Sequence, residues 1–286
     1  MAASVRVALP PQLVEEARAF SDGTREPAEP RDAATVALMR AGDDGPELYL
    51  LRRQTSMAFA GGMCVFPGGG VDPRDFDHAV GWAGPQPAEW AAQLGTDEAT
   101  ARALVCAAVR ETFEESGVLL AGESGDTVVA DTTGEDWERD RAALEARELA
   151  LTDFLDRRGL VLRTDLLGVW AAWLTPVFEP RRYRTWFFVA DLPAGQVTRD
   201  VSTESDTVTW LPAMQAVREV EEERLLMLPP TYLTCLEVGQ YADPEAVLVA
   251  AQGRRVEMFT PQVEETDAGG VLTVPPRLET LLETRS

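Results

Sequence analysis

The sequence predicts an α/β fold built on a mixed sheet, and three observations support this prediction. Strand-like apolar segments alternate with helical patterns along the whole chain. The first two strand-like segments are joined by a short turn, so they run antiparallel, which disfavours a purely parallel sheet. The 286 residues are 45% hydrophobic and 26% charged, a composition typical of a globular protein with one large domain and extensions.

The N-terminal third contains a helix, a linker and a hairpin. Consecutive prolines mark the start of the helix, and a segment rich in Pro, Asp, Glu and Arg follows it. Two apolar strands then flank a Gly-Asp-Asp-Gly-Pro turn, which predicts the hairpin. The expected elements are a helix at 10–20, a linker at 21–32, strands at 33–39 and 47–51, and a loop-like segment at 71–96.

Residues 97–116 carry the clearest helix signal in the chain. Thr96 is suited to cap the start of this helix, and Asp97 and Glu98 favour its electropositive first turn. Gly117 is placed to end it. We therefore expect one continuous helix here, packed on the sheet.

The second half of the chain continues the mixed pattern and then adds an extension. The expected elements are a polar segment at 121–134, a helix at 135–157, strands at 166–174, 185–192 and 207–211, helices at 213–226, 229–241 and 243–253, and a terminal hairpin of 256–263 with 270–274.

The charge and residue content of the chain exclude several classes of function. Forty-eight acidic against 26 basic residues give a net charge of −22, which disfavours general nucleic-acid or membrane binding. The chain has no lysine, which excludes a Schiff-base lysine, and its single histidine, His78, excludes a multi-histidine metal site. Three scattered cysteines and no secretory signal favour a cytoplasmic protein.

Three glutamates on the 97–116 helix form the candidate site. Glu111, Glu114 and Glu115 share one helical face, so three carboxylates project into a small volume. A divalent cation would relieve their repulsion, and an oxygen-only ligand set favours Mg²⁺ or Mn²⁺. Arg110 could pair with one carboxylate and orient it. An acidic pair on a helix is usually only a solvated face, but the upstream run of glycines at 68–70 would allow close backbone approach to a ligand.

These two elements resemble the signature of the Nudix hydrolase superfamily. Residues 66–69 resemble its glycine element, and residues 110–118, Arg-Glu-Thr-Phe-Glu-Glu-Ser-Gly-Val, resemble its Arg-Glu-apolar-x-Glu-Glu-x-Gly-apolar element. The spacing differs, because Gly69 and Arg110 lie 41 positions apart where the family has 14, an insertion of 27. Counted back from Arg110, the signature's middle glutamate falls on Arg102, so this element is expected to be missing.

The long spacing is similar to one branch of the family, whose animal members are peroxisomal coenzyme A diphosphatases. The resemblance implies a Nudix-type α/β/α sandwich at residues 33–240, with insertions at 71–96 and 121–163. Residues 1–32 then form an N-terminal helix and linker, and 241–286 a C-terminal helix and hairpin extension. Because a long loop closes at little extra cost, we expect Gly68 and Glu115 to lie close together.

The resemblance also assigns roles to residues. It implies that Glu111, Glu114 and Glu115, with the Gly68 carbonyl, hold Mg²⁺ or Mn²⁺, and that Glu111 could alternatively act as the base. A further acidic residue from a late loop is expected to be Glu204, with Asp206 as the alternative. The arginines expected to bind an anionic substrate are Arg52, Arg53, Arg181, Arg182 and Arg184.

The function expected from this resemblance is Mg²⁺-dependent hydrolysis of a diphosphate linkage. Coenzyme A or acyl-coenzyme A is the first expected substrate. ADP-ribose, a nucleotide sugar or a dinucleoside polyphosphate is the alternative, and a non-catalytic Nudix binding module is a third interpretation. The expected partner is thus a small-molecule diphosphate, and the chain could act as a homodimer.

Overall fold

The computed structural model describes residues 9–56, 60–77, 79–266 and 269–284. His78 lies outside these residues. The described strands are β1 (Arg31–Gly42), β2 (Gly45–Arg53), β3 (Cys64–Val65), β4 (Gly68–Gly70), β5 (Gly81–Ala83), β6 (Ala121–Gly122), β7 (Val161–Arg163), β8 (Leu167–Leu174), β9 (Tyr183–Asp191), β10 (Ser205–Pro212), β11 (Met258–Phe259), β12 (Val263–Thr266) and β13 (Gly269–Leu272).

The described helices are α1 (Pro11–Ser21), η1 (Pro73–Phe76), α2 (Pro87–Leu94), α3 (Glu98–Ser116), α4 (Glu135–Glu145), α5 (Leu151–Arg158), η2 (Thr164–Leu166), α6 (Ala213–Glu221), α7 (Pro229–Val238), α8 (Pro244–Ala251) and α9 (Pro276–Glu283).

The predicted mixed sheet is confirmed. Its main path runs β10-β2-β1-β9-β8-β11, with β3 paired to β2 and β4 paired to β1. The neighbours β1 and β9 are parallel, whereas β1 and β2 form the expected antiparallel hairpin. One edge of β1 is shared, because β2 pairs with residues 39–42 and β4 with residues 33–35. The glycine strand β4 therefore pairs with the part of this edge that β2 does not cover.

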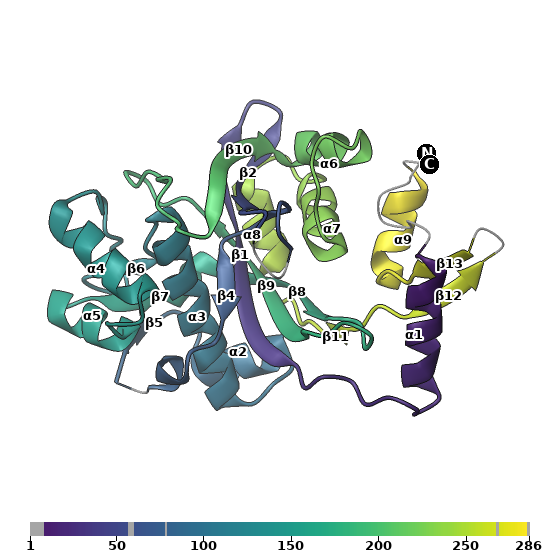
Figure 1. Cartoon of the computed structure of the whole chain (residues 1–286). Coiled ribbons are helices and arrows are strands. Elements are labelled where there is room, and N and C mark those ends of the chain that lie inside the picture. Colours follow the sequence, from purple (N-terminus) through teal and green to yellow (C-terminus); the bar gives the residue numbers. More distant parts are fainter. Residues whose placement is uncertain (1–8, 57–59, 78, 267–268, 285–286) are drawn as a thin grey trace.

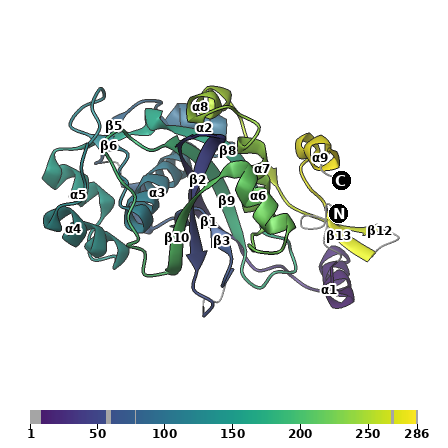
Figure 2. The ribbon, with the colours of Figure 1, turned by 90° about the horizontal axis from the view of Figure 1, so that it is seen from above.

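The sheet lies between two layers of helices, so the structure is an α/β/α sandwich. The alternation of β1 sends Val36 and Leu38 to one face and Ala37 and Met39 to the other. The first face packs against α2, α3, α4 and α5, and the second against α6, α7, α8 and α9. Figures 1 and 2 show the sheet between these layers.

The helix predicted at 97–116 is present as α3, the longest helix in the described part of the chain. Its N-cap is Asp97, which accepts a hydrogen bond from the Thr100 amide at 3.0 Å, and not Thr96 as predicted. The helix ends at Gly117, whose positive φ of 74° is favourable only for glycine. Nearly every residue of α3 from Ala101 onward is buried, since helices and sheet surround it.

Three sequence predictions need correction. The segment 71–96 is not a loop but contains η1, β5 and α2, and the helix predicted at 135–157 is two helices, α4 and α5, separated by a turn. The terminal hairpin is β12 with β13, while residues 258–259 form β11 and pair with β8 in the main sheet. Short segments such as these pair through tertiary contacts that local periodicity does not reveal.

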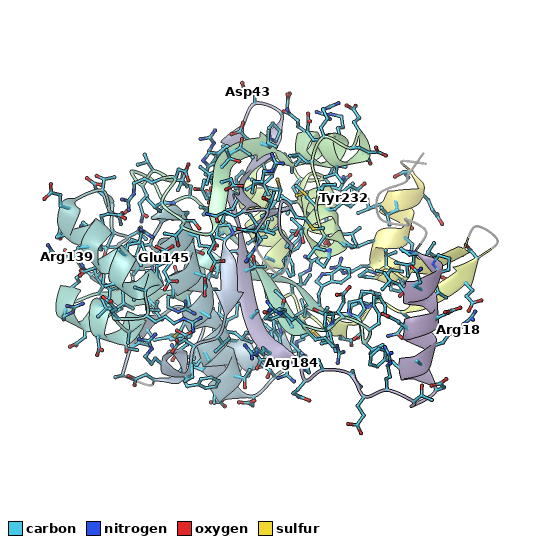
Figure 3. The ribbon with its side chains drawn as sticks, viewed as in Figure 1. Arg18, Asp43, Arg139, Glu145, Arg184 and Tyr232 are labelled. Atoms are coloured by element: carbon cyan, nitrogen blue, oxygen red, sulfur yellow. The ribbon has the colours of Figure 1, made fainter. Side chains whose placement is uncertain are left out.

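The two insertions are joined to each other. Strand β5 of the first pairs with β7 of the second, and β6 completes a separate three-stranded sheet. The two ends of the chain also meet. Helix α1 packs beside the β12–β13 hairpin, with Leu9 donating to the Gly270 carbonyl at 2.7 Å and Arg18 paired with Glu265. Figure 1 shows this group beside α9, away from the sheet, and Figure 3 shows Arg18 on its helix.

The sandwich predicts where substitutions will destabilise the protein. Leu38→Ala should lower the free energy of unfolding by about 2–5 kcal/mol, because Leu38 is fully buried and its truncation leaves a cavity beneath α3. Val249→Ala on α8, 57% exposed, should change it by about 0.5 kcal/mol or less. Urea unfolding followed by circular dichroism measures both, and equal effects would contradict this arrangement.

Candidate active site

The candidate site forms where α3 crosses the glycine strand β4. Helix and strand can meet here only because the residues of β4 are glycines, which have no Cβ atom. A Cβ atom on Gly69 would lie 2.6 Å from the Glu111 carboxylate, and one on Gly68 would lie 2.6 Å from the Thr35 Cα. Glycine at both positions therefore lets strand, helix and carboxylate approach closely. The predicted close approach of this backbone to a ligand stays a prediction.

Gly68 and Glu115 meet, as predicted, despite the inserted residues. The Gly68 amide donates a hydrogen bond to Glu115 Oε2 at 2.7 Å. The chain leaves the site after η1 and returns along α2 and α3, so the insertion closes at nearly the point where it opens. The two halves of the signature are thereby reassembled.

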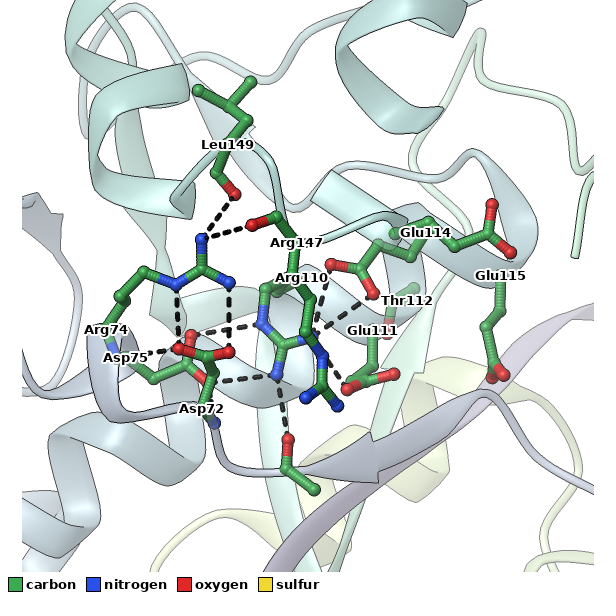
Figure 4. Close-up of polar contacts among 12 residues, drawn as sticks. Asp72, Arg74, Asp75, Arg110, Glu111, Thr112, Glu114, Glu115, Arg147 and Leu149 are labelled. Carbon is green, nitrogen blue, oxygen red and sulfur yellow. Dashed lines mark hydrogen bonds and ion pairs between the residues drawn. The ribbon is translucent and has the colours of Figure 1, made fainter. Parts of the chain in front are cut away.

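Arg110 is the central cation of this site. Its Nη1 donates to Glu111 at 2.7 Å and to both carboxylate oxygens of Glu114 at 3.2 Å. Its Nε and Nη2 donate to the two oxygens of Asp75 at 3.1 and 3.0 Å, and Nη2 also reaches the Gly70 carbonyl at 3.0 Å. Figure 4 shows Arg110 between Asp75 and the two glutamates. The predicted orienting role of Arg110 therefore has a definite geometry.

Asp75 was missed by the sequence analysis. Counting back from Arg110 placed the middle acidic residue at Arg102, but counting forward from Gly69 places it, six positions on, at Asp75. The 27 extra residues therefore come after Asp75, between it and Arg110. Arg102 instead stacks on the Trp82 ring, 4.8 Å from its centroid. The acidic element is thus present as an aspartate, and its signal was the spacing from the glycine.

Burial raises the pKa of the three candidate-site glutamates, Glu111, Glu114 and Glu115. For Glu114, burial and then the charge of Glu111 raise the pKa to about 8, against the opposing effect of Arg110. For Glu115, burial and the charge of Glu111 raise the pKa well above its usual range, and the Gly68 hydrogen bond only partly opposes them. Burial also raises the pKa of Glu111, again opposed by Arg110. Burial is thus the largest cause of all three shifts, and Arg110 opposes it at Glu111 and Glu114.

Glu204 is the second acidic residue that the structure places near the cluster. Its carboxylate pairs with Arg53 at 3.0 Å, and its charge contributes to the raised pKa of Glu111 and of Glu115. Asp206 is exposed and falls at a register irregularity between β10 and β2. Of the two predicted candidates, Glu204 is therefore the one close to the glutamates of α3.

The predicted substrate arginines separate into different environments. Arg53 lies at the end of β2 and acts electrostatically on Glu115, and its neighbour Arg52 is exposed. Arg182 is buried and donates to the carbonyls of Ala28 and Thr175 at 3.1 Å, which holds the linker before β1. Arg184 pairs with Asp32 at 2.6 Å, and Arg181 is exposed.

The donor set suits a hard divalent cation in its chemistry. The carboxylates of Glu111, Glu114 and Glu115 lie near one end of α3, and the charge of Glu111 raises the pKa of the other two. A divalent cation bound by these oxygens would remove this repulsion. Within the described residues, no three acidic, cysteine or histidine side chains converge closely enough to define a cation site by themselves. In this arrangement Arg110 takes one oxygen of Glu111 and both oxygens of Glu114.

Comparisons with known proteins identify the family of this chain. The NUDT19 Nudix domain family matches residues 85–237, more than half of the chain. The acyl-coenzyme A diphosphatase NUDT19 of Xenopus laevis is 23% identical over 269 residues, which cover 80% of this chain and 70% of that protein. Its counterpart in Gallus gallus is 27% identical over 260 residues, with 71% and 66% covered. A Nudix relative from Caenorhabditis elegans is 27% identical over 216 residues, with 74% and 62% covered.

The crystal structure of a NUDIX hydrolase from Alicyclobacillus acidocaldarius is similar over 80% of this chain and 99% of that one, with a TM-score of 0.67 and 25% identity. The family match and the fold place the chain in the Nudix hydrolase superfamily. Within that class, the chain belongs to the NUDT19 Nudix domain family. It spans 62% to 70% of the length of the three animal relatives. In the part of the chain that the structure describes, no helix has the length and apolar character needed to cross a membrane.

The ion pair across the split signature should stabilise the fold. Asp75→Asn removes the charge that Arg110 faces and places an amide among its N–H donors, so it should lower the free energy of unfolding by about 3 kcal/mol. Asp77→Asn, exposed in the same insertion, is the matched control and should have little effect. Urea unfolding compares the two variants, and a wild-type midpoint for Asp75→Asn would contradict the role of this pair.

The raised pKa of Glu114 predicts an unusual pH dependence for the metal-free protein. The folded state keeps the proton of Glu114 up to about pH 8, whereas the unfolded chain loses it near 4.5. The folded state therefore binds more protons between these values, and its stability should fall as the pH rises through this window, by at most about 1.4 kcal/mol per pH unit for each linked proton. Urea unfolding in EDTA from pH 5 to 8.5 measures this slope. Glu114→Gln should flatten it, and a stability that rises with pH would refute the assignment.

Proposed function

We propose that this chain hydrolyses a diphosphate linkage in a nucleoside diphosphate derivative, with Mg²⁺ or Mn²⁺ as cofactor and coenzyme A or acyl-coenzyme A as substrate. The observation that carries the proposal is the placement of the Glu111 and Glu115 carboxylates against the backbone of β4, with Glu114 held beside them by Arg110. The choice of substrate is supported by the two relatives named as acyl-coenzyme A diphosphatases, at 23% and 27% identity.

The roles of the chain's own residues follow from their contacts. Glu111, Glu114 and Glu115, with the Gly68 carbonyl, would hold the cation, and Glu204 would complete the acidic side of the site. When bound, the cation lowers the pKa of an attacking water and stabilises charge on the phosphoryl oxygens. Arg110, fixed by Asp75, sets the orientation of Glu111 and Glu114. Alternatively, Glu111 acts as the general base and accepts a proton from the attacking water.

Arg53 is the best placed of the proposed substrate-binding arginines. Its guanidinium contacts Glu204, and its side chain remains 19% exposed at the end of β2. A protein of net charge −22 needs local positive charge of this kind to bind an anion. Arg52 and Arg181 are exposed, so they too can contact the substrate. Arg182 already donates to backbone carbonyls, and Arg184 is paired with Asp32.

Other diphosphates remain the alternative substrates: ADP-ribose, nucleotide sugars and dinucleoside polyphosphates. A non-catalytic binding module is disfavoured, because the full set of carboxylates is present together with its orienting arginine. The cytoplasmic location and the homodimer stay predictions.

A hydrolysis screen tests the proposal. Wild-type protein with Mg²⁺ or Mn²⁺ should convert coenzyme A or its thioesters into two phosphomonoesters, a 3′-phosphorylated adenosine monophosphate and a 4′-phosphopantetheine, identified by mass. ADP-ribose and diadenosine polyphosphates run beside them, and faster cleavage of these would reassign the substrate. No cleavage of any diphosphate with either cation would reject the function.

A substitution links that activity to α3. Glu115→Gln keeps an acceptor for the Gly68 amide but removes the charge, so the fold should persist while kcat/KM falls about a hundredfold, equivalent to about 3 kcal/mol. Glu98→Gln, exposed at the other end of the same helix, is the matched control. Mg²⁺ should raise the Tm of the wild type and of Glu98→Gln more than that of Glu115→Gln. Equal shifts and equal rates would remove Glu115 from the site.

A further inference from the structure

Helix α4, in the second insertion, presents one charged face to the candidate site. Glu138, Arg141 and Glu145 are three and four residues apart, so they lie on the same side of this helix. Arg141 pairs with both glutamates, at 2.7 Å to Glu138 and 3.0 Å to Glu145. Arg139, on another side of α4, is exposed, and Figure 3 shows it at the outer margin of the molecule, with Glu145 nearer the middle.

This face is anchored on the end of α3. Arg141, whose side chain is only 5% exposed, donates to the main-chain carbonyl of Glu114 at 2.5 Å. A cation at this point also suits the negative end of the helix dipole. Glu138 holds Arg199, whose own amide donates to the Ser116 carbonyl at 2.9 Å. Helix α4 is therefore fixed relative to the glutamates of α3.

From this fixed position Glu145 holds a second segment. Its Oε1 accepts hydrogen bonds from the amide and the hydroxyl of Thr203, at 2.9 and 2.7 Å. Thr203 immediately precedes Glu204. On the other side, the Gln54 side chain donates to the Thr203 carbonyl at 2.9 Å, and the Gln54 amide donates to the Glu204 carbonyl at 3.0 Å. The backbone at 203–204 is thus held between α4 and the end of β2.

We propose that Glu145 is a positioning residue that acts through Thr203 to set where the Glu204 carboxylate stands relative to the glutamates of α3. The inference rests on the proposed function only in giving Glu204 a role in binding the cation. The Glu204 side chain is 54% exposed and its carboxylate is paired with Arg53, so its place depends on how its backbone is held. Without Glu145, Arg141 keeps Glu138 and the Glu114 carbonyl, so α4 itself stays anchored.

The test measures Mn²⁺ binding to the metal-free protein by calorimetry, alongside kcat/KM. Glu145→Ala should weaken Mn²⁺ binding about three- to tenfold and lower kcat/KM about tenfold. Glu145→Gln should recover most of both, because its amide oxygen can accept both Thr203 hydrogen bonds. Glu148→Ala, with the same charge change at an exposed side chain just beyond α4, is the matched control and should behave as wild type.

A double-mutant cycle separates positioning from a merely structural effect. If Glu145 acts through Glu204, then Glu145→Ala should cost less than twofold in either measurement when Glu204 is already glutamine. Amide hydrogen exchange at Thr203 should also quicken about tenfold in Glu145→Ala, and not in Glu148→Ala. Independent, multiplicative effects of Glu145→Ala and Glu204→Gln would overturn the inference, as would Glu145→Gln behaving like Glu145→Ala.

The inference and the proposed function can fail separately. A protein that binds Mn²⁺ with the coupled response, yet hydrolyses no diphosphate, would reject the proposed function and keep the positioning role. An active hydrolase with multiplicative effects would do the reverse. A wild type that binds no Mn²⁺ and hydrolyses nothing would overturn both.

Discussion

The contact on which the rest of this structure depends is that of Arg110 with Asp75 and the glutamates of α3. A single buried guanidinium faces Asp75 on one side and Glu111 and Glu114 on the other. Buried carboxylates at this spacing repel one another and are costly to desolvate. Arg110 stabilises the charged forms of Glu111 and Glu114, but burial first, and then the charge of Glu111, still raises the pKa of Glu114 and Glu115. A nearby divalent cation would oppose both effects.

Both insertions contribute contacts to the cluster around Arg110. The first supplies Asp75 before it departs, and its Arg74 both pairs with Asp72 and reaches the Arg147 and Leu149 carbonyls in the turn between α4 and α5. Figure 4 shows this chain of contacts running from the α4–α5 turn to the glutamates. The second insertion supplies α4, which caps the end of α3. Strands β5, β7 and β6 then join the two insertions in one small sheet.

The arginines of this protein lie beside its converging acidic groups. The chain as a whole is strongly acidic, yet arginines stand at the places where acidic groups converge. Arg141 and Arg199 meet the C-terminal end of α3, where its dipole is negative, and Arg53 meets Glu204. The guanidinium suits these positions because it remains charged when buried and donates in several directions at once.

The sequence by itself determined the elements whose signals are local. The mixed sheet, the β1–β2 hairpin, α3 and its three glutamates follow from periodicity, turn residues and a terminal glycine, and the meeting of Gly68 with Glu115 follows from the resemblance to the split signature. Only the tertiary structure decided which acidic residue faces Arg110, because that pair spans 35 positions of chain and depends on where the insertion begins. It likewise decided that Glu204 and not Asp206 approaches the cluster, and that α4 supports it. These choices rest on contacts between segments far apart in sequence, which a local pattern cannot encode.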